Sequence, residues 1–222
     1  MKKRRLNYIL SKFQYNTFVQ VILDALKMLK IRINPYLIFL EGLRLVPSGF
    51  QTSKPVGIEF GFLSKDHMPL LVDFPDRNES LKTLDERLDH GDICVAAWSD
   101  GKIVAFTWAD LAEISFLPYR LVLLDNEAYL YDAYTSIEFR GKRIADLLRY
   151  HLYVVLAEQG RNNLYSVSQR FNPPAIRFKS KLGAKIVDSG ISVKFFGRLE
   201  IKTPSHPKKI RAYVNLGDCP PD

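Results

Sequence analysis

The 222-residue sequence predicts an α+β (α/β) fold, a mixed central sheet with helices on both faces, preceded by a helical N-terminal extension. Three observations predict it. Apolar residues recur at helical spacing over residues 6–32, the period changes to two at residues 56–62, and strand and helix patterns then alternate. This length suits one core with an appendage. We therefore expect a basic helical extension (1–50), a mixed domain (51–200) and a basic, Pro-containing tail (201–222).

The composition is typical of a folded chain inside the cell. Hydrophobic residues make up 47% of the sequence and charged residues 25%, which excludes wholesale disorder. No stretch approaches the roughly 18 uncharged apolar residues of a spanning helix, and no signal-peptide pattern follows Met1. We therefore expect a cytoplasmic protein. Cys94 and Cys219 make neither a disulfide framework nor a zinc site, so we expect no metal.

The net charge of +8 is concentrated toward the ends of the chain. Residues 1–44 contain nine Lys or Arg against two acids, and residues 194–211 contain six against one. Nucleic acid is not the expected partner, because no helix-turn-helix, RNA-recognition or zinc pattern accompanies this charge. Peripheral contact of the basic, aromatic N-terminus with an anionic membrane is an open alternative.

The first segment has a wide apolar face with a narrow polar stripe between residues 18 and 29, which predicts a helix. Asn34-Pro35 is expected to end it, because a residue before proline is pushed out of the α region. The apolar face is expected to pack on the core or on a second copy of the chain, which makes a homodimer a candidate. Residues 36–46 form a second apolar stretch of undetermined type.

The later elements follow in order along the chain. Alternating or β-branched apolar runs predict strands at residues 56–62, 93–98, 103–108, 128–137, 164–168 and within 186–199. Periodic patterns with start and stop residues predict helices at residues 75–90, from 144 toward Gly160, and at 173–182. The Asp100-Gly101 pair predicts a tight hairpin between the second and third strands.

The most informative segment is the basic turn at residues 140–143, between the strand at 128–137 and the strongest helix of the sequence. Such a turn directs unpaired backbone N–H groups and the positive end of the helix dipole at one spot. Gly141 permits close approach of the backbone, and the basic side chains add charge. The segment predicts a site for an anionic group such as a pyrophosphate, and a solvated basic turn is the alternative.

This segment resembles the acetyl-CoA-binding motif of the GNAT (Gcn5-related) N-acetyltransferase superfamily, whose core reads Q/R-x-x-G-x-G/A. Arg140 matches its first position and Ala145 its last, whereas Arg143 replaces the middle glycine. That long side chain must point outward or itself hold a phosphate. The resemblance covers roughly residues 56–199 and implies acetyl-CoA, or another acyl-CoA, as the cofactor.

A second segment carries an independent match. Residues 172–183 resemble the family's N-x-x-A-x-x-x-Y-x-x-x-G helix, with Asn172, Ala175 and Gly183 in place. The family's Asn contacts the pantetheine arm and its Tyr often protonates the departing thiolate. Lys179 stands at the Tyr position, where a surface lysine is the expected environment. Together the two matches imply these cofactor-binding residues: Tyr134, Thr135, Ser136, Arg140, Gly141, Lys142, Arg143, Ile144, Ala145 and Asn172.

In this fold the fourth and fifth strands splay apart, and the thioester lies in the cleft between them. Here those strands are residues 128–137 and 164–168. One sequence does not settle which side chains of the fourth strand face the cleft. The candidates for a general base or acid are Glu127, Tyr129, Asp132 and Tyr165, and each has an ordinary structural interpretation as a salt-bridged acid or a core tyrosine.

The resemblance implies an N-acyltransferase that moves acetyl from acetyl-CoA to a primary amine by direct attack in a ternary complex. The sequence does not identify the amine. The alternative is a catalytically silent GNAT-fold module that uses its basic N-terminal arm to bind a membrane surface, nucleic acid or protein. The departures at Arg143 and Lys179 favour that alternative.

Overall fold

The computed structural model describes residues 30–72, 74, 79–117, 120–196, 199–203 and 210–211. Within this part of the chain one mixed sheet has the strand order β10-β9-β1-β8-β7-β4-β3-β2. Its strands are β1 Ile31–Glu41, β2 Glu59–Phe62, β3 Ile93–Ser99, β4 Lys102–Asp110, β7 Glu127–Thr135, β8 Asn163–Gln169, β9 Lys185–Phe195 and β10 Leu199–Lys202. A separate hairpin pairs β5 Glu113–Ile114 with β6 Leu121–Val122. The helices are α3 Met68–Val72, α4 Leu81–Asp89, α5 Ile144–Glu158 and α6 Pro173–Lys181, with 3-10 turns η1 Leu43–Leu45, η2 Lys65–His67 and η3 Ile137–Phe139.

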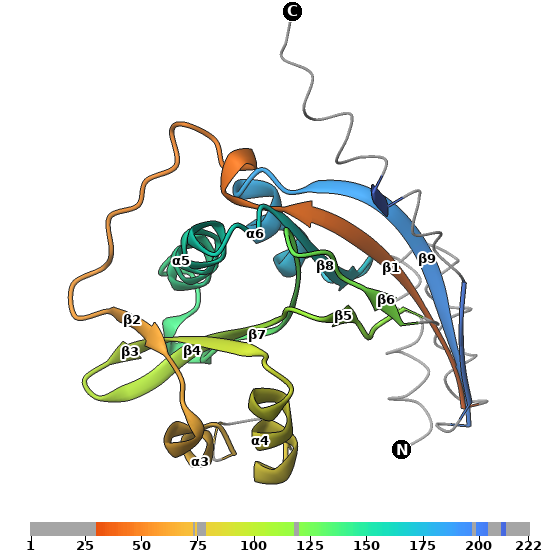
Figure 1. Ribbon diagram of the computed structural model, residues 1–222, viewed down its shortest axis with the longest axis horizontal. Helices are drawn as coiled ribbons and strands as arrows, with labels where there is room; N and C mark the ends of the chain where they lie inside the picture. The colour runs from red at the N-terminus through yellow and green to blue at the C-terminus, as the bar shows by residue number, and fades with distance from the viewer. Residues whose placement is uncertain are drawn as a thin grey trace, which may run out of the picture.

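Helices cover both faces of the sheet, as the sequence predicts. Figure 1 shows α5 on one side of β3, β4 and β7, and α3 with α4 on the other. On the α5 side, Leu148 and Leu152 pack in a cluster with Leu130. On the other side, Met68 and Leu84 pack with the fully buried Trp108. Among the described residues, no helix is both long and apolar enough to cross a membrane.

The expected hairpin between the second and third strands is confirmed. β3 and β4 pair antiparallel to Ser99↔Lys102, and both turn residues have positive φ, 47° at Asp100 and 74° at Gly101. This is the two-residue turn that the twist of paired strands favours. The helix expected at residues 75–90 is shorter than predicted, since α4 spans only Leu81–Asp89. Ser80 caps its N-terminus, where the Ser80 hydroxyl accepts a hydrogen bond from the Thr83 N–H.

The first strand departs most from the expectation. The helix expected over residues 6–32 lies mostly outside the described residues, but Ile31–Glu41 is a strand, and Pro35 lies within it. β1 pairs antiparallel with β8 on one side and with β9 on the other. The domain expected to begin at residue 51 therefore contains a strand from the expected extension. The second half of β1, Tyr36 to Glu41, is buried, which explains why the apolar run at residues 36–46 begins there.

The expected C-terminal tail also contributes to the domain. Ile201 and Lys202 belong to β10. Ile210 is fully buried against the cluster that contains Tyr36, and Arg211 forms an ion pair with Glu127 on β7. These parts of residues 201–222 therefore pack on the sheet.

β7 and β8 run parallel and then separate, as the resemblance implies. Their pairing extends from Glu127↔Asn163 to Leu130↔Ser166. β7 continues to Thr135 and β8 to Gln169 beyond that point. Beyond Leu130 and Ser166 the two strands are no longer paired with each other, which leaves a gap in the sheet. The site described next includes residues of β7 beyond this point.

Candidate active site

The turn after β7 brings a helix N-terminus and a basic side chain together. The first hydrogen bond of α5 runs from the Leu147 N–H to the Arg143 carbonyl at 3.1 Å. The N–H groups of residues 144–146 therefore precede the hydrogen-bond ladder of the helix. The Arg140 guanidinium lies 5.5 Å from the Tyr134 ring centroid, and its Nε donates to the Thr135 carbonyl at 3.1 Å. The arrangement favours an anion.

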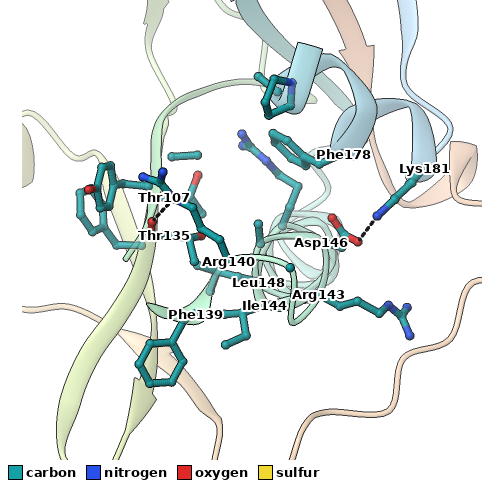
Figure 2. A pocket seen from close by; sticks show the side chains of 18 of the residues that line it. Thr107, Thr135, Phe139, Arg140, Arg143, Ile144, Asp146, Leu148, Phe178 and Lys181 are labelled. Carbon is teal, nitrogen blue, oxygen red and sulfur yellow. Dashed lines mark hydrogen bonds and ion pairs between the residues drawn. The ribbon is translucent and has the colours of Figure 1, made fainter. Parts of the chain in front are cut away.

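Arg143 occupies a position that suits glycine, with a φ of 63°. Its side chain forms no cap on α5 and donates to the Gln51 carbonyl at 2.8 Å and to the Gln51 side chain at 3.2 Å. Its guanidinium also lies over the Phe50 ring. Figure 2 shows this side chain extending away from Arg140. The sequence left two possibilities for Arg143, to point outward or to hold a phosphate. In the structure its side chain points outward.

A cavity of about 560 Å³ lies between β7, α5 and α6 (Figure 2). Eight of the ten expected cofactor-binding residues line it: Tyr134, Thr135, Arg140, Gly141, Arg143, Ile144, Ala145 and Asn172. Ser136 instead lines a neighbouring hollow, and Lys142 is exposed with its Nζ over the Phe139 ring. The structure thus gathers residues from two distant motifs around one space.

Asn172 begins α6 and lines the cavity. Its Oδ1 accepts the Ala175 N–H at 3.3 Å, so the capping bond fixes the side chain at the cavity wall. At the other end of α6, Gly183 has a φ of 75°, and a Cβ there would overlap the Leu45 carbonyl. Only glycine fits this contact between α6 and η1 without a shift in the backbone.

Two buried polar side chains of the cavity wall have no hydrogen-bond partner among the described residues. One is the hydroxyl of Thr107, and the other is the guanidinium of Arg149 at Nε and Nη1. Their residues are only 2% and 3% exposed. Buried donors without acceptors are costly, so both side chains have an unmet demand for a polar partner.

A buried ionic cluster lies behind this wall, where β7 and β8 separate. Glu41, on β1, lies 3.7 Å from Arg149 Nε and 3.6 Å from Lys179 Nζ. Its carboxylate also accepts hydrogen bonds from Ser166 and from Tyr153, the latter at 2.5 Å. Burial, the largest effect, raises the pKa of Glu41, but the two cations and two hydroxyls outweigh it and hold this pKa below the ordinary value.

Lys179 is buried, at 3% exposure, which corrects the expectation of a surface lysine. Its Nζ donates to Ser166 Oγ at 2.6 Å and to the Val167 carbonyl at 3.4 Å, and it lies over the Phe39 ring. Burial lowers the pKa of Lys179 to about 8, because removal of the ammonium from water outweighs the attraction of Glu41. No local pattern around Lys179 predicts this environment, because Phe39 and Glu41 come from β1.

The sequence matches the model of the family described as "Acetyltransferase (GNAT) family" over residues 62–184, more than half of the chain. The chain belongs to the GNAT acetyltransferase family. Members of this family use acetyl-CoA in general. A search of curated proteins found no significant sequence match.

Solved structures agree with the family assignment in fold. A GNAT-family acetyltransferase from Colwellia psychrerythraea superposes with a TM-score of 0.54 and 15% identity, over 74% of this chain and 56% of that one. A structure described as a GNAT-family acetyltransferase from Novosphingobium aromaticivorans superposes with a TM-score of 0.53 and 19% identity, over 79% of this chain and 66% of that one. A tandem GNAT protein from the clavulanic acid biosynthesis pathway superposes with a TM-score of 0.56 and 14% identity, over 78% of this chain and 55% of that one. The chain spans less than two thirds of each of these proteins, and such identities establish the fold alone.

The four expected catalytic candidates of this GNAT protein lie apart from the cavity wall, as far as the described residues define it. Glu127 and Tyr165 are hydrogen-bonded to each other at 3.1 Å, and Arg211 holds both oxygens of Glu127 at 3.0 and 2.9 Å. Tyr129 is buried, and burial raises its pKa. Asp132 pairs with Arg87 at 2.7 Å. These contacts match the structural interpretation of each residue.

A bulge in β7 decides which side chains share a face. Tyr134 pairs with Phe106 and Tyr131 with Trp108, so Asp132 and Ala133 together oppose Thr107. The φ of Asp132 is 46°, as the extra residue requires. Because the alternation shifts by one, Tyr131 and Tyr134 lie on the same face, that of α3 and α4. The alternation of β7 is therefore regular from Tyr129 to Tyr131 and is interrupted after Tyr131.

A polar cluster that the sequence did not indicate lies on that face. His90, Asp92 and Asp110 bring their ligand atoms within 4.8 Å of one another, a grouping that a metal ion also uses. Both acids already have hydrogen-bond partners. The Asp92 carboxylate accepts a hydrogen bond from the Tyr131 hydroxyl and is hydrogen-bonded to His90 Nδ1 at 3.0 Å. Asp110 accepts two backbone N–H groups, at 2.8 and 2.9 Å. Burial, the largest effect, raises the pKa of Asp92.

Proposed function

We propose that this protein is an acyl-CoA-dependent N-acyltransferase, which moves an acyl group, in the simplest case acetyl, to a primary amine by direct attack in a ternary complex. The observation that carries the proposal is the cavity between β7, α5 and α6. It begins at the helix N-terminus beside Arg140 and is lined by the end of β7, residues 133–135, beyond the point at which β7 stops pairing with β8. Residues of both family motifs line it.

The residues present fit an acyl-CoA, which supplies an activated thioester when bound. The N–H groups of residues 144–146 and the Arg140 guanidinium suit a pyrophosphate. Asp146 does not oppose it as a lone charge, because Lys181 lies 3.4 Å from its carboxylate. The backbone of β7 beyond Leu130 is not paired with β8 and suits the amides of a pantetheine arm, as an added strand would.

Lys179 is the proposed source of the proton for the departing thiolate, although it lies behind the cavity wall and outside the cavity lining. It stands at the position of the family's tyrosine, and its Nζ contacts Ser166, the last β8 residue paired with β7. With a pKa lowered to about 8, its ammonium is a stronger acid than an exposed lysine and carries its proton at neutral pH. Glu41 attracts this ammonium from β1, and Arg149 from α5 pairs with the same carboxylate.

The second candidate function is the silent binding module, which the departures at Arg143 and Lys179 motivate. The outward side chain of Arg143 leaves the helix N-terminus open, so that departure alone is no obstacle to an acyl-CoA. The two candidates share a cofactor site and differ in chemistry. Turnover therefore discriminates between them.

Titration calorimetry with CoA and acetyl-CoA tests the cofactor site, and release of CoA from acetyl-CoA with a panel of amines tests the reaction. We expect both ligands to bind below millimolar concentration and at least one amine to stimulate release. If the folded protein binds neither ligand, the proposed function is wrong. Binding without stimulation by any amine favours the silent module.

A further inference from the structure

We infer that the cavity accepts an acyl group that ends in a carboxylate, and that Arg149 binds this carboxylate. The inference rests on the proposed function and adds the class of acyl donor. It begins from an unusual feature, an arginine that lines the cavity, is only 3% exposed, and has two nitrogens, Nε and Nη1, without an acceptor in the described protein.

Arg149 is too far from its nearest acid to be satisfied by it. Its Nε lies 3.7 Å from the Glu41 carboxylate, which is an ion-pair distance and beyond a hydrogen bond. The Glu41 oxygens are instead occupied by the hydroxyls of Ser166 and Tyr153. The face of Phe178 lies 5.7 Å from the guanidinium and supplies no acceptor. A ligand oxygen is therefore the group that these donors lack.

The local charges favour an anion over a neutral oxygen. Arg149 and Lys179 face a single carboxylate, that of Glu41, and all three side chains are at most 3% exposed. Because Lys179 is largely protonated at neutral pH, the cluster carries one excess positive charge. A thioester or amide carbonyl would accept a hydrogen bond and leave this charge uncompensated, whereas a carboxylate accepts a charge-assisted hydrogen bond from the guanidinium and neutralises it.

The position of Arg149 along the cavity separates it from the proposed pyrophosphate site. It lies five residues beyond the first residue of α5, or roughly 7.5 Å along the helix axis. Through Glu41 and Ser166 it adjoins the point at which β7 and β8 part. That is the proposed thioester end, so the group that meets Arg149 belongs to the acyl side of the donor. The unpartnered hydroxyl of Thr107 lines the same cavity and adds a second donor for such a group.

The test compares butyryl-CoA with succinyl-CoA, two donors of equal carbon number that differ in a terminal methyl or carboxylate group. We expect the 222-residue chain to bind succinyl-CoA at least about tenfold more tightly by calorimetry, the scale of a hydrogen bond to a charged group. Arg149→Met is expected to abolish this preference, and Arg149→Lys to retain part of it. Lys181→Ala removes another cation of the cavity wall and is expected to leave the ratio unchanged.

Equal binding of butyryl-CoA and succinyl-CoA by the wild-type protein would overturn the inference and leave the proposed function standing. This comparison needs no variant, so it holds even if Arg149→Met fails to fold. A preference that survives in a folded Arg149→Met variant would also overturn it. If the wild-type protein binds no CoA derivative at all, the proposed function fails, and this inference fails with it.

Discussion

The ammonium group of Lys179, on α6, lies 3.6 Å from the carboxylate of Glu41, on β1, and both side chains are buried. This pair connects a strand from the start of the described chain to the helix that follows β8. Arg149 joins the pair from α5. Three elements therefore meet in one ionic cluster at the gap in the sheet, and its charges bear on both stability and ligand binding.

Glu41→Gln should strongly destabilise the protein. The substitution keeps the shape of the side chain but leaves two buried cations, Arg149 and Lys179, without a compensating charge. Loss of one partner from a buried ion pair costs about 3–5 kcal/mol of the free energy of unfolding, which urea denaturation measures. Glu86→Gln, at an exposed pair with Lys82, is the matched control and should change it by less than about 1 kcal/mol. Similar effects of the two variants would contradict the buried cluster.

Stability should rise with pH between about 8 and 10.5 because of Lys179. Its pKa is lowered in the folded chain from 10.5 to about 8, so across this window the unfolded chain binds more protons. The free energy of unfolding then increases with pH. The groups that face the ammonium are Glu41 from β1, Arg149 from α5 and Ser166 from β8.

Urea denaturation of the wild type and of Lys179→Met across this pH window isolates the effect, since other titrating groups contribute to both proteins. The difference in free energy between the two proteins should shift in favour of the wild type as pH rises. A difference that is constant with pH would show that the lysine has an ordinary pKa.

Arg140→Ala should weaken CoA binding by about 1.5–3 kcal/mol, the scale of a hydrogen bond to a charged group. Arg140 lines the cavity beside the helix N-terminus, whereas the neighbouring Lys142 is exposed and lies outside the lining. Lys142→Ala is therefore the control, and calorimetry should show a change well below that of Arg140→Ala. Equal losses would indicate a diffuse basic surface in place of a defined phosphate site.

Deletion of residues 1–45 should give insoluble or aggregated protein. It removes β1, which pairs with β8 and β9 and carries Glu41, so two strands lose their neighbour. Changing Lys2, Lys3, Arg4 and Arg5 to Ser should leave solubility and melting temperature nearly unchanged. Size-exclusion chromatography and thermal melts compare the two proteins with the full chain. A soluble, monomeric deletion protein of equal stability would show that β1 is dispensable.

The sequence by itself determined the local elements and the two motifs. Periodicity predicts β3, β4, β7 and α5, since each carries its pattern of apolar residues within a short window. The Asp100-Gly101 turn and the basic turn before α5 follow from residues that favour positive φ or a helix start. Local chemistry of this kind needs no partner from elsewhere in the chain, which is why these predictions agree with the structure.

Only the tertiary structure decided what surrounds the cavity. The bulge at Asp132 follows from how β7 fits β4, and the burial of Lys179 follows from the insertion of β1 between β8 and β9. Glu41, Arg149 and Lys179 are distant in sequence, and each alone resembles an ordinary surface residue. Their charges interact because a non-local strand pairing removes all three from water, and the pattern along one strand or helix does not encode such pairing.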